Sequence, residues 1–174
     1  PLYSSAASDV YKRQITNLPD YKKAFLEQKS IKNIEEKLEK EIKMQSLGLP
    51  IQFVIILGNF YPDEKEEILD SIAKQNLKEG KKDFAGYYQI PFQTLIDQEL
   101  VRMTIFVDDS ASVTTDQDLR KAVKKLDASN LPDGAYSFYY SNRKDDSADT
   151  LRYSFKVKDG EVVFSEDQKD ELED

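Results

Sequence analysis

The chain has 174 residues, of which 39% are hydrophobic and 33% charged, and it contains no cysteine and no histidine. This composition fits one or at most two small domains, and it excludes disulfides, thiol nucleophiles, Ser–His catalysis and Cys/His zinc sites. No apolar run approaches the ~18 residues of a membrane-spanning helix, so we expect no membrane span. The lack of cysteine fits a reducing compartment or a bacterial surface equally well.

The net charge of −8 is unevenly distributed along the chain. Residues 159–174 contain eight acidic side chains and one lysine, whereas the other 158 residues contain 24 basic and 25 acidic side chains. Phosphate binding needs a net positive stripe, so we expect no nucleic-acid partner. A run of like charges prefers to stay solvated, which predicts an acidic disordered tail over residues 167–174.

The first fourteen residues, PLYSSAASDVYKRQ, have no amphipathic period. The stretch from Ser8 to Gln14 resembles the conceptual translation of a sequencing adapter found at the ends of environmental assemblies. That resemblance implies that residues 1–14 are not native and that the sequence comes from a metagenome or transcriptome. We therefore expect the chain to be a fragment of a longer protein, and we leave these residues out of the fold prediction.

The stretch from Leu18 to Met44 has the pattern of an amphipathic helix. Its apolar side chains recur at steps of three and four, and Lys and Glu occupy most positions between them. Gly48 and Pro50 end the pattern. We expect residues 15–49 to form an amphipathic helical segment that packs on its own domain, with docking to a partner helix as the alternative.

The middle of the chain alternates between strand and helix patterns. Continuous β-branched runs are typical of buried central strands, whereas acidic first turns and capping hydroxyls are typical of helix starts. The elements expected here are, in order, a buried central strand over residues 51–57, a helix from Pro62 to Gly80, a strand over 84–97 with an edge-type proline at Pro91, a strand over 100–107 and a helix over 116–126 capped by Thr115.

The C-terminal third shows the clearest strand pattern. Apolar and polar side chains alternate over residues 135–141 and again over 151–158, which predicts two strands with one dry and one wet face. Asp159 and Gly160 form a strong two-residue hairpin signal before a third strand over 162–164. These three strands predict an antiparallel meander.

Taken together, the elements predict an α+β fold. From residue 51 onward their order is β-α-β-β-α-β, which is the ferredoxin-like order, and the meander extends that sheet at its C-terminal end. We expect one α+β domain over residues 50–166, preceded by the helical segment over 15–49. A fold of this kind hosts many unrelated functions and does not define one.

Aromatic residues are concentrated on the predicted meander, where they could form either a core or a stacking platform. The alternation favours the core for all but one of them, because Tyr139 alone falls on the wet face. The tyrosines that we assign as candidate binding residues are Tyr139, Tyr87 and Tyr88. The aromatic residues that we expect in the core are Tyr136, Phe138, Tyr140, Tyr153 and Phe155.

One short motif suggests a metal site. Asp108, Ser110 and Ser112 follow a predicted strand, and this Asp-x-Ser-x-Ser pattern resembles the metal-binding signature of von Willebrand A domains. The resemblance implies a Mg²⁺ or Ca²⁺ ion held by one carboxylate and two hydroxyls, with open positions for an acidic ligand. Ala111 stands where that family usually has glycine. The alternative is an ordinary turn between a strand and a helix, where Asp and Ser are common.

No set of residues in the sequence defines a catalytic centre, so we assign no catalytic residue and no cofactor beyond that metal ion. The leading interpretation is a non-enzymatic α+β protein that binds another macromolecule, most simply a protein partner, or serves a structural role. The first alternative is a divalent-metal-dependent adhesion-type site at Asp108, Ser110 and Ser112. The second alternative is an acidic inhibitor whose tail occupies a basic groove on its target.

Overall fold

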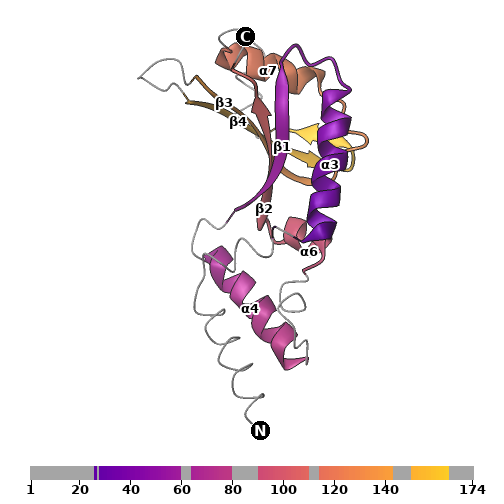
Figure 1. Cartoon of the computed structure of the whole chain (residues 1–174), viewed down its shortest axis with the longest axis vertical. Helices are drawn as coiled ribbons and strands as arrows, with labels where there is room; N and C mark the ends of the chain where they lie inside the picture. The colour runs from indigo at the N-terminus through magenta and orange to yellow at the C-terminus, as the bar shows by residue number, and fades with distance from the viewer. Residues whose placement is uncertain are drawn as a thin grey trace. The chain divides into compact units, whose positions relative to one another are not determined.

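The computed structural model describes residues 26, 28–59, 64–79, 90–109, 114–142 and 150–164. These residues form a mixed α+β structure with a five-stranded sheet and four helices (Figure 1), as the sequence predicts at this level. The chain divides into two compact units. The first unit combines Pro1–Lys32 with Gly58–Leu100, and the second combines Asn33–Leu57 with Val101–Asp174.

The sheet belongs to the second unit, apart from the last residue of its first strand. Its strands lie side by side in the order of the sequence. In that order they are β1 (Ile51–Gly58), β2 (Val101–Val107), β3 (Gly134–Ser141), β4 (Thr150–Lys158) and β5 (Glu161–Val163).

The pairing directions follow from the connections between the strands. Strands β2 and β3 are parallel, because helix α7 (Asp116–Lys125) carries the chain back between them. The pairs β3–β4 and β4–β5 are antiparallel, which confirms the predicted meander. The amide of Asp108, just after β2, donates a hydrogen bond to the carbonyl of Pro50, just before β1, at 2.7 Å. Strands β1 and β2 are therefore antiparallel.

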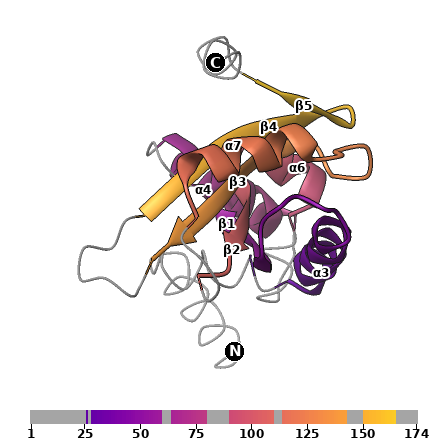
Figure 2. The ribbon, with the colours of Figure 1, turned by 90° about the horizontal axis from the view of Figure 1, so that it is seen from above.

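One face of the sheet carries the aromatic core, and we call it the inner face. Helix α7 packs against β4 and is drawn above the sheet in Figure 2, with Leu119, Ala122 and Val123 buried. The ring of Phe155 lies 5.4 Å from the ring of Tyr136 and 5.7 Å from the ring of Phe138, measured between centroids. All five aromatic residues predicted for the core are at most 6% exposed, which confirms the predicted face assignment.

Helix α7 begins as the sequence predicts. The hydroxyl of Thr115 accepts a hydrogen bond from the amide of Asp118, and the Asp118 carboxylate accepts one from the amide of Thr115 at 2.8 Å. This reciprocal capping box satisfies amides that have no partner within the helix. The hydrogen bonds from Thr115 lower the pKa of Asp118 below its usual value.

Helix α3 (Lys29–Lys43) lies within the segment predicted to be helical over residues 15–49, of which residues 15–25 and 27 lie outside the described part. In the second unit the helix lies beside β1 (Figure 1). The carboxylates of Glu35 and Glu39 accept hydrogen bonds from the amides of Ile56 and Val54, each at 2.9 Å. These amides lie on the edge of β1 that faces away from β2. The helix therefore covers an edge that would otherwise be open to pairing with another strand.

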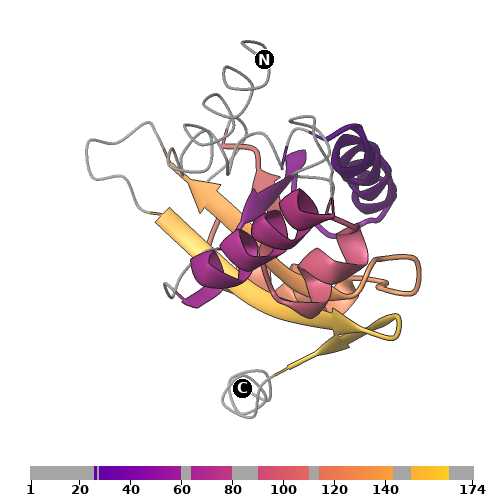
Figure 3. The ribbon, with the colours of Figure 1, turned by 90° about the horizontal axis from the view of Figure 1, so that it is seen from below.

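The β4–β5 hairpin turns at Asp159 and Gly160, as predicted, and can be followed in yellow in Figure 3. Both residues have positive φ angles, 51° and 75°, as a two-residue type I′ turn requires. A side chain at Gly160 would also bring its Cβ to 3.3 Å from the Cα of Ser129. Glycine is therefore favoured at this position by both backbone angle and space.

The first unit contains helices α4 (Glu64–Lys78) and α6 (Phe92–Asp97). Helix α4 lies within the predicted span from Pro62 to Gly80, and acidic side chains occupy its first turn. Helix α6 corrects the strand predicted over residues 84–97, of which 84–89 lie outside the described residues. The apolar residues of this segment are spaced for a helix as well as for a strand, and the fully buried Leu95 and the preceding Pro91 suit the helix.

Two further expectations about the sheet are corrected. In the ferredoxin-like order the strand after the second helix lies beside the first strand, whereas here β3 lies beside β2. The described strands therefore do not follow the ferredoxin-like order. Strand β1 is an edge strand of the described sheet and not a central one. Its apolar run is explained by α3, which covers its edge, and by the burial of Val54 and Ile56 at 2% exposure each.

Candidate functional site

The face of the sheet opposite to the aromatic core carries the candidate site, and we call it the outer face. The strand register aligns its side chains in rows that run across β2, β3 and β4. Read from β2 to β4, these are Phe106, Tyr139 and Arg152, then Thr104, Ser137 and Ser154, then Arg102, Ala135 and Lys156.

The first of these rows continues onto β1, and we call Phe53, Phe106, Tyr139 and Arg152 the aromatic row. The ring centroid of Phe106 lies 4.6 Å from that of Phe53 and 5.1 Å from that of Tyr139. The guanidinium carbon of Arg152 lies 5.5 Å from the Tyr139 centroid, within cation–π distance. The three rings are half-buried and the arginine is exposed. A continuous aromatic surface therefore crosses three strands, and Arg152 extends it onto the fourth.

The three rings of the aromatic row, Phe53, Phe106 and Tyr139, line a hollow of about 230 Å³. Polar residues line the hollow together with the rings. Such a combination recognises a ligand by stacking and by a few directed hydrogen bonds. The residues that line the hollow are Gln52, Phe53, Phe106, Val107, Asp109, Tyr139 and Ser141.

The middle row consists of small hydroxyl side chains covered by a longer neighbour. The Arg102 Nη1 donates a hydrogen bond to Ser154 Oγ at 2.9 Å, which takes the guanidinium diagonally across β3. Ser137, which lies between these two strands, is fully buried, and its Oγ has no hydrogen-bond partner in the described structure. Burying a hydroxyl without a partner costs about 1–3 kcal/mol.

Of the predicted binding tyrosines, the structure places one in the candidate site. Tyr139 lies at the centre of the aromatic row, between Phe106 and Arg152. Tyr87 and Tyr88 lie outside the described residues, so their assignment stays a prediction.

The predicted metal site is described only in part. Asp108 is half-buried just after β2, whereas Ser110 and Ser112 lie outside the described residues. Within the part of the chain that is described, no group of three or more acidic residues could hold a metal ion. The Mg²⁺ or Ca²⁺ site at Asp108, Ser110 and Ser112 therefore stays a prediction.

Three members of the aromatic row, Phe53, Phe106 and Arg152, were not identified from the sequence. Phe53 begins an apolar run to Leu57 and Phe106 lies between Ile105 and Val107, so neither has polar neighbours on both sides to show which way it faces. Arg152 falls on the predicted wet face, but only the register shows that it lies opposite Tyr139. One signal could have identified Phe106. It lies four residues after Arg102 on the same predicted strand, so its side chain falls on the same face as that of the charged arginine.

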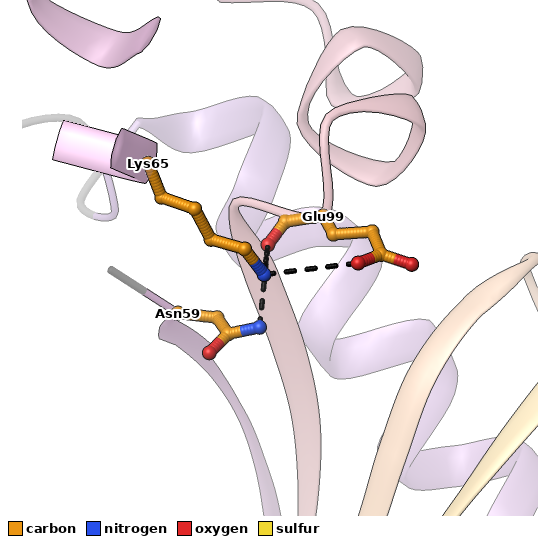
Figure 4. Close-up of polar contacts among 3 residues, drawn as sticks. All are labelled: Asn59, Lys65 and Glu99. Carbon is orange, nitrogen blue, oxygen red and sulfur yellow. Dashed lines mark hydrogen bonds and ion pairs between the residues drawn. The ribbon is translucent and has the colours of Figure 1, made fainter. Parts of the chain in front are cut away.

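The first unit contains a polar cluster of Asn59, Lys65 and Glu99 (Figure 4). The Lys65 ammonium donates to the carbonyl of Glu99 at 3.0 Å and lies 3.7 Å from its carboxylate, and the amide of Asn59 donates to the same carbonyl at 3.3 Å. Glu99 has a positive φ of 53°. These contacts hold a strained turn beside the end of β1, which gives the cluster a structural role.

Comparison with protein-family models, with curated proteins and with solved structures gives no match to this chain. Among the described residues, no helix is long and apolar enough to cross a membrane.

Proposed function

We propose that this chain is a non-enzymatic binding module that holds a segment of a partner protein on its aromatic row. The observation that carries the proposal is the unbroken contact from Phe53 through Phe106 and Tyr139 to Arg152 on the outer face. Aromatic residues and arginine are the residue types enriched at the centres of protein interfaces. No cofactor is needed for binding of this kind.

The dimensions of the row suit a short segment of polypeptide. Four neighbouring strands span about 14 Å, since adjacent strands lie ~4.8 Å apart. The rings offer apolar contact to the side chains of such a segment. Ser141, which shares the outer face with Tyr139, lines the hollow and offers a hydroxyl to the backbone of such a segment. Protein is favoured over nucleic acid because the chain outside residues 159–174 is nearly neutral.

A library of random 12-residue peptides displayed on phage provides the probe for this proposal. Peptides selected on the full chain should move the backbone amide signals of Phe53, Phe106 and Tyr139 in NMR spectra. The Phe106→Ala variant should bind a selected peptide at least ~30-fold more weakly, as expected when an interface hot spot is truncated. The matched control is Lys121→Ala on the exposed side of α7, which should bind as the unaltered chain does.

Two outcomes of the peptide selection would contradict the proposal. One is a selection that yields no peptide bound by the full chain, and the other is a set of selected peptides whose amide shifts fall outside the aromatic row. Because Phe106→Ala removes a half-buried ring, Arg152→Ala provides a second variant at an exposed position. Unchanged affinity in both variants would also overturn the proposal.

A further inference from the structure

A second hollow of about 350 Å³ lies on the same part of the sheet. Arg102, Ala135 and Lys156 are aligned across β2, β3 and β4, and Val163 on β5 lies opposite Lys156. We call these four residues the cationic row. All four line the hollow, together with Ser154 and Phe164 among others. Val163 is 46% exposed, so an apolar side chain lies open to solvent beside two cations.

The outward-facing positions of β2, β3 and β4 carry cations and no carboxylate. Side chains alternate along a strand, so on β4 these positions are Thr150, Arg152, Ser154, Lys156 and Lys158. On β2 the outward side chains include Arg102, and on β3 they are small or aromatic. On β5 the outward carboxylate of Glu161 lies opposite Lys158, so the cations that remain for an acidic segment are Arg102, Arg152 and Lys156.

The chain that follows β5 has the opposite charge to these cations. Residues 165–174, which lie outside the described residues, contain six carboxylates and one lysine. They follow directly on Phe164, which lines the hollow. Ten residues reach up to ~33 Å, more than twice the ~14 Å from β5 across to β2. A segment tethered so closely acts at an effective concentration of roughly millimolar.

We infer that the acidic segment 165–174 is the occupant of the cationic row, where its carboxylates lie against Arg102 and Lys156. This inference deepens the proposed function and rests on it for its consequence. The cationic row is separated from the aromatic row only by the middle row of hydroxyl side chains. An acidic segment on the cationic row therefore competes with an incoming partner for the outer face. A partner must therefore displace the segment, or bring a charge pattern that replaces it.

The inference differs from the inhibitor alternative in where the acidic segment binds. There, the segment occupies a basic groove on another protein, whereas here its first target is the sheet that it follows. Charge complementarity and the short connection through Phe164 favour the intramolecular contact. Binding to another molecule is then one outcome of the test, because only an intermolecular contact depends on protein concentration.

The test uses the full chain and a variant of the same length in which every carboxylate of the segment becomes an amide. The backbone amides of Arg102, Ala135 and Lys156 should differ in NMR chemical shift between the two proteins. The differences should disappear in 1 M NaCl, where the Debye length is ~3 Å. They should also be the same at all protein concentrations. The substitutions are Glu166→Gln, Asp167→Asn, Asp170→Asn, Glu171→Gln, Glu173→Gln and Asp174→Asn.

A charge-matched pair of further variants locates the contact. Lys156→Gln removes a cation from the cationic row and should abolish most of the shift differences, whereas Lys121→Gln on α7 should preserve them. Shift differences that are absent, that lie on α7, or that grow with protein concentration would overturn the inference. A peptide selected on the aromatic row should bind the six-fold variant at least about threefold more tightly than the unaltered chain.

These readouts separate the inference from the proposed function. The shift differences require no peptide, so they decide the docking of the acidic segment even if the phage selection fails. If a selected peptide binds both proteins equally, the competition between segment and partner is refuted and the aromatic row remains a binding site.

Discussion

The two faces of the sheet both carry aromatic residues, but these residues have different roles on each face. On β3, Phe138 is fully buried on the inner face, whereas its neighbour Tyr139 is half-buried on the outer face. The inner rings pack against each other beneath α7, and the outer rings form a row that ends in Arg152. An aromatic residue on this sheet is thus structural or available for binding according to its position in the alternation and not its type.

The strongest test of this comparison replaces neighbouring residues on β4. Phe155→Ala should lower the free energy of unfolding by about 3–5 kcal/mol, because it empties a site that is 3% exposed and in contact with two other rings. Lys156→Ala, one residue further on the outer face, should change it by less than ~0.5 kcal/mol. Urea titration of both variants measures the difference. Equal stabilities would show that the faces are wrongly assigned.

A smaller loss of stability is expected when the edge of the sheet is altered. Glu39→Ala leaves the Val54 amide on β1 without the carboxylate that accepts its hydrogen bond at 2.9 Å. A hydrogen bond to a charged group contributes about 1.5–3 kcal/mol, and this one is partly buried, so we expect a loss toward the lower end of that range. The exposed Glu36 on the same helix provides the control, since Glu36→Ala should cost less than ~0.5 kcal/mol. Thermal unfolding measures the difference. If both variants have the same melting temperature, Glu39 does not stabilise the edge of the sheet.

Local signals in the sequence were sufficient to predict most of the strands, turns and helix starts of the second unit. The capping box at Thr115, the Asp159–Gly160 turn and the alternation on β3 and β4 each concern residues close together in the chain. Such features are specified by short-range sterics and hydrogen bonding, which a single sequence displays directly.

The order of the strands and the residues of the candidate site could not be predicted, because both depend on contacts between residues that are far apart in the sequence. Strand β1 is placed at an edge by carboxylates of α3 that lie 15 and 21 residues earlier. Residues 92–97 have apolar spacing that fits either helix or strand, and tertiary packing of Leu95 decides between them. The aromatic row joins Phe53 to Phe106 across more than 50 residues, and no local pattern shows that contact.

The smallest effect concerns a single hydroxyl on the inner face. The Tyr136 hydroxyl donates a hydrogen bond of 2.6 Å to the carbonyl of Pro132. Tyr136→Phe should therefore cost about 0.5–1.5 kcal/mol at pH 7, the usual net value of such a bond. Tyr139→Phe, on the outer face, should change the free energy of unfolding by less than ~0.5 kcal/mol. A matching cost at both positions would mean that the Tyr136 hydroxyl makes no special contribution.

The same hydroxyl gives the inner face a dependence on alkaline pH. Burial raises the pKa of Tyr136 above its ordinary value, and the nearby Asp133 carboxylate raises it further. Between the unfolded pKa of about 10 and the higher folded pKa, the unfolded chain has lost the proton that the folded chain keeps. The contribution to stability is therefore fully present below about pH 10 and is lost as the pH rises toward the folded pKa. Urea titrations at pH 8 and pH 11 should show a steeper loss for the unaltered chain than for Tyr136→Phe, which has no proton to lose at this position. If both proteins lose stability in parallel, the Tyr136 hydroxyl is not held in its neutral form by the inner face.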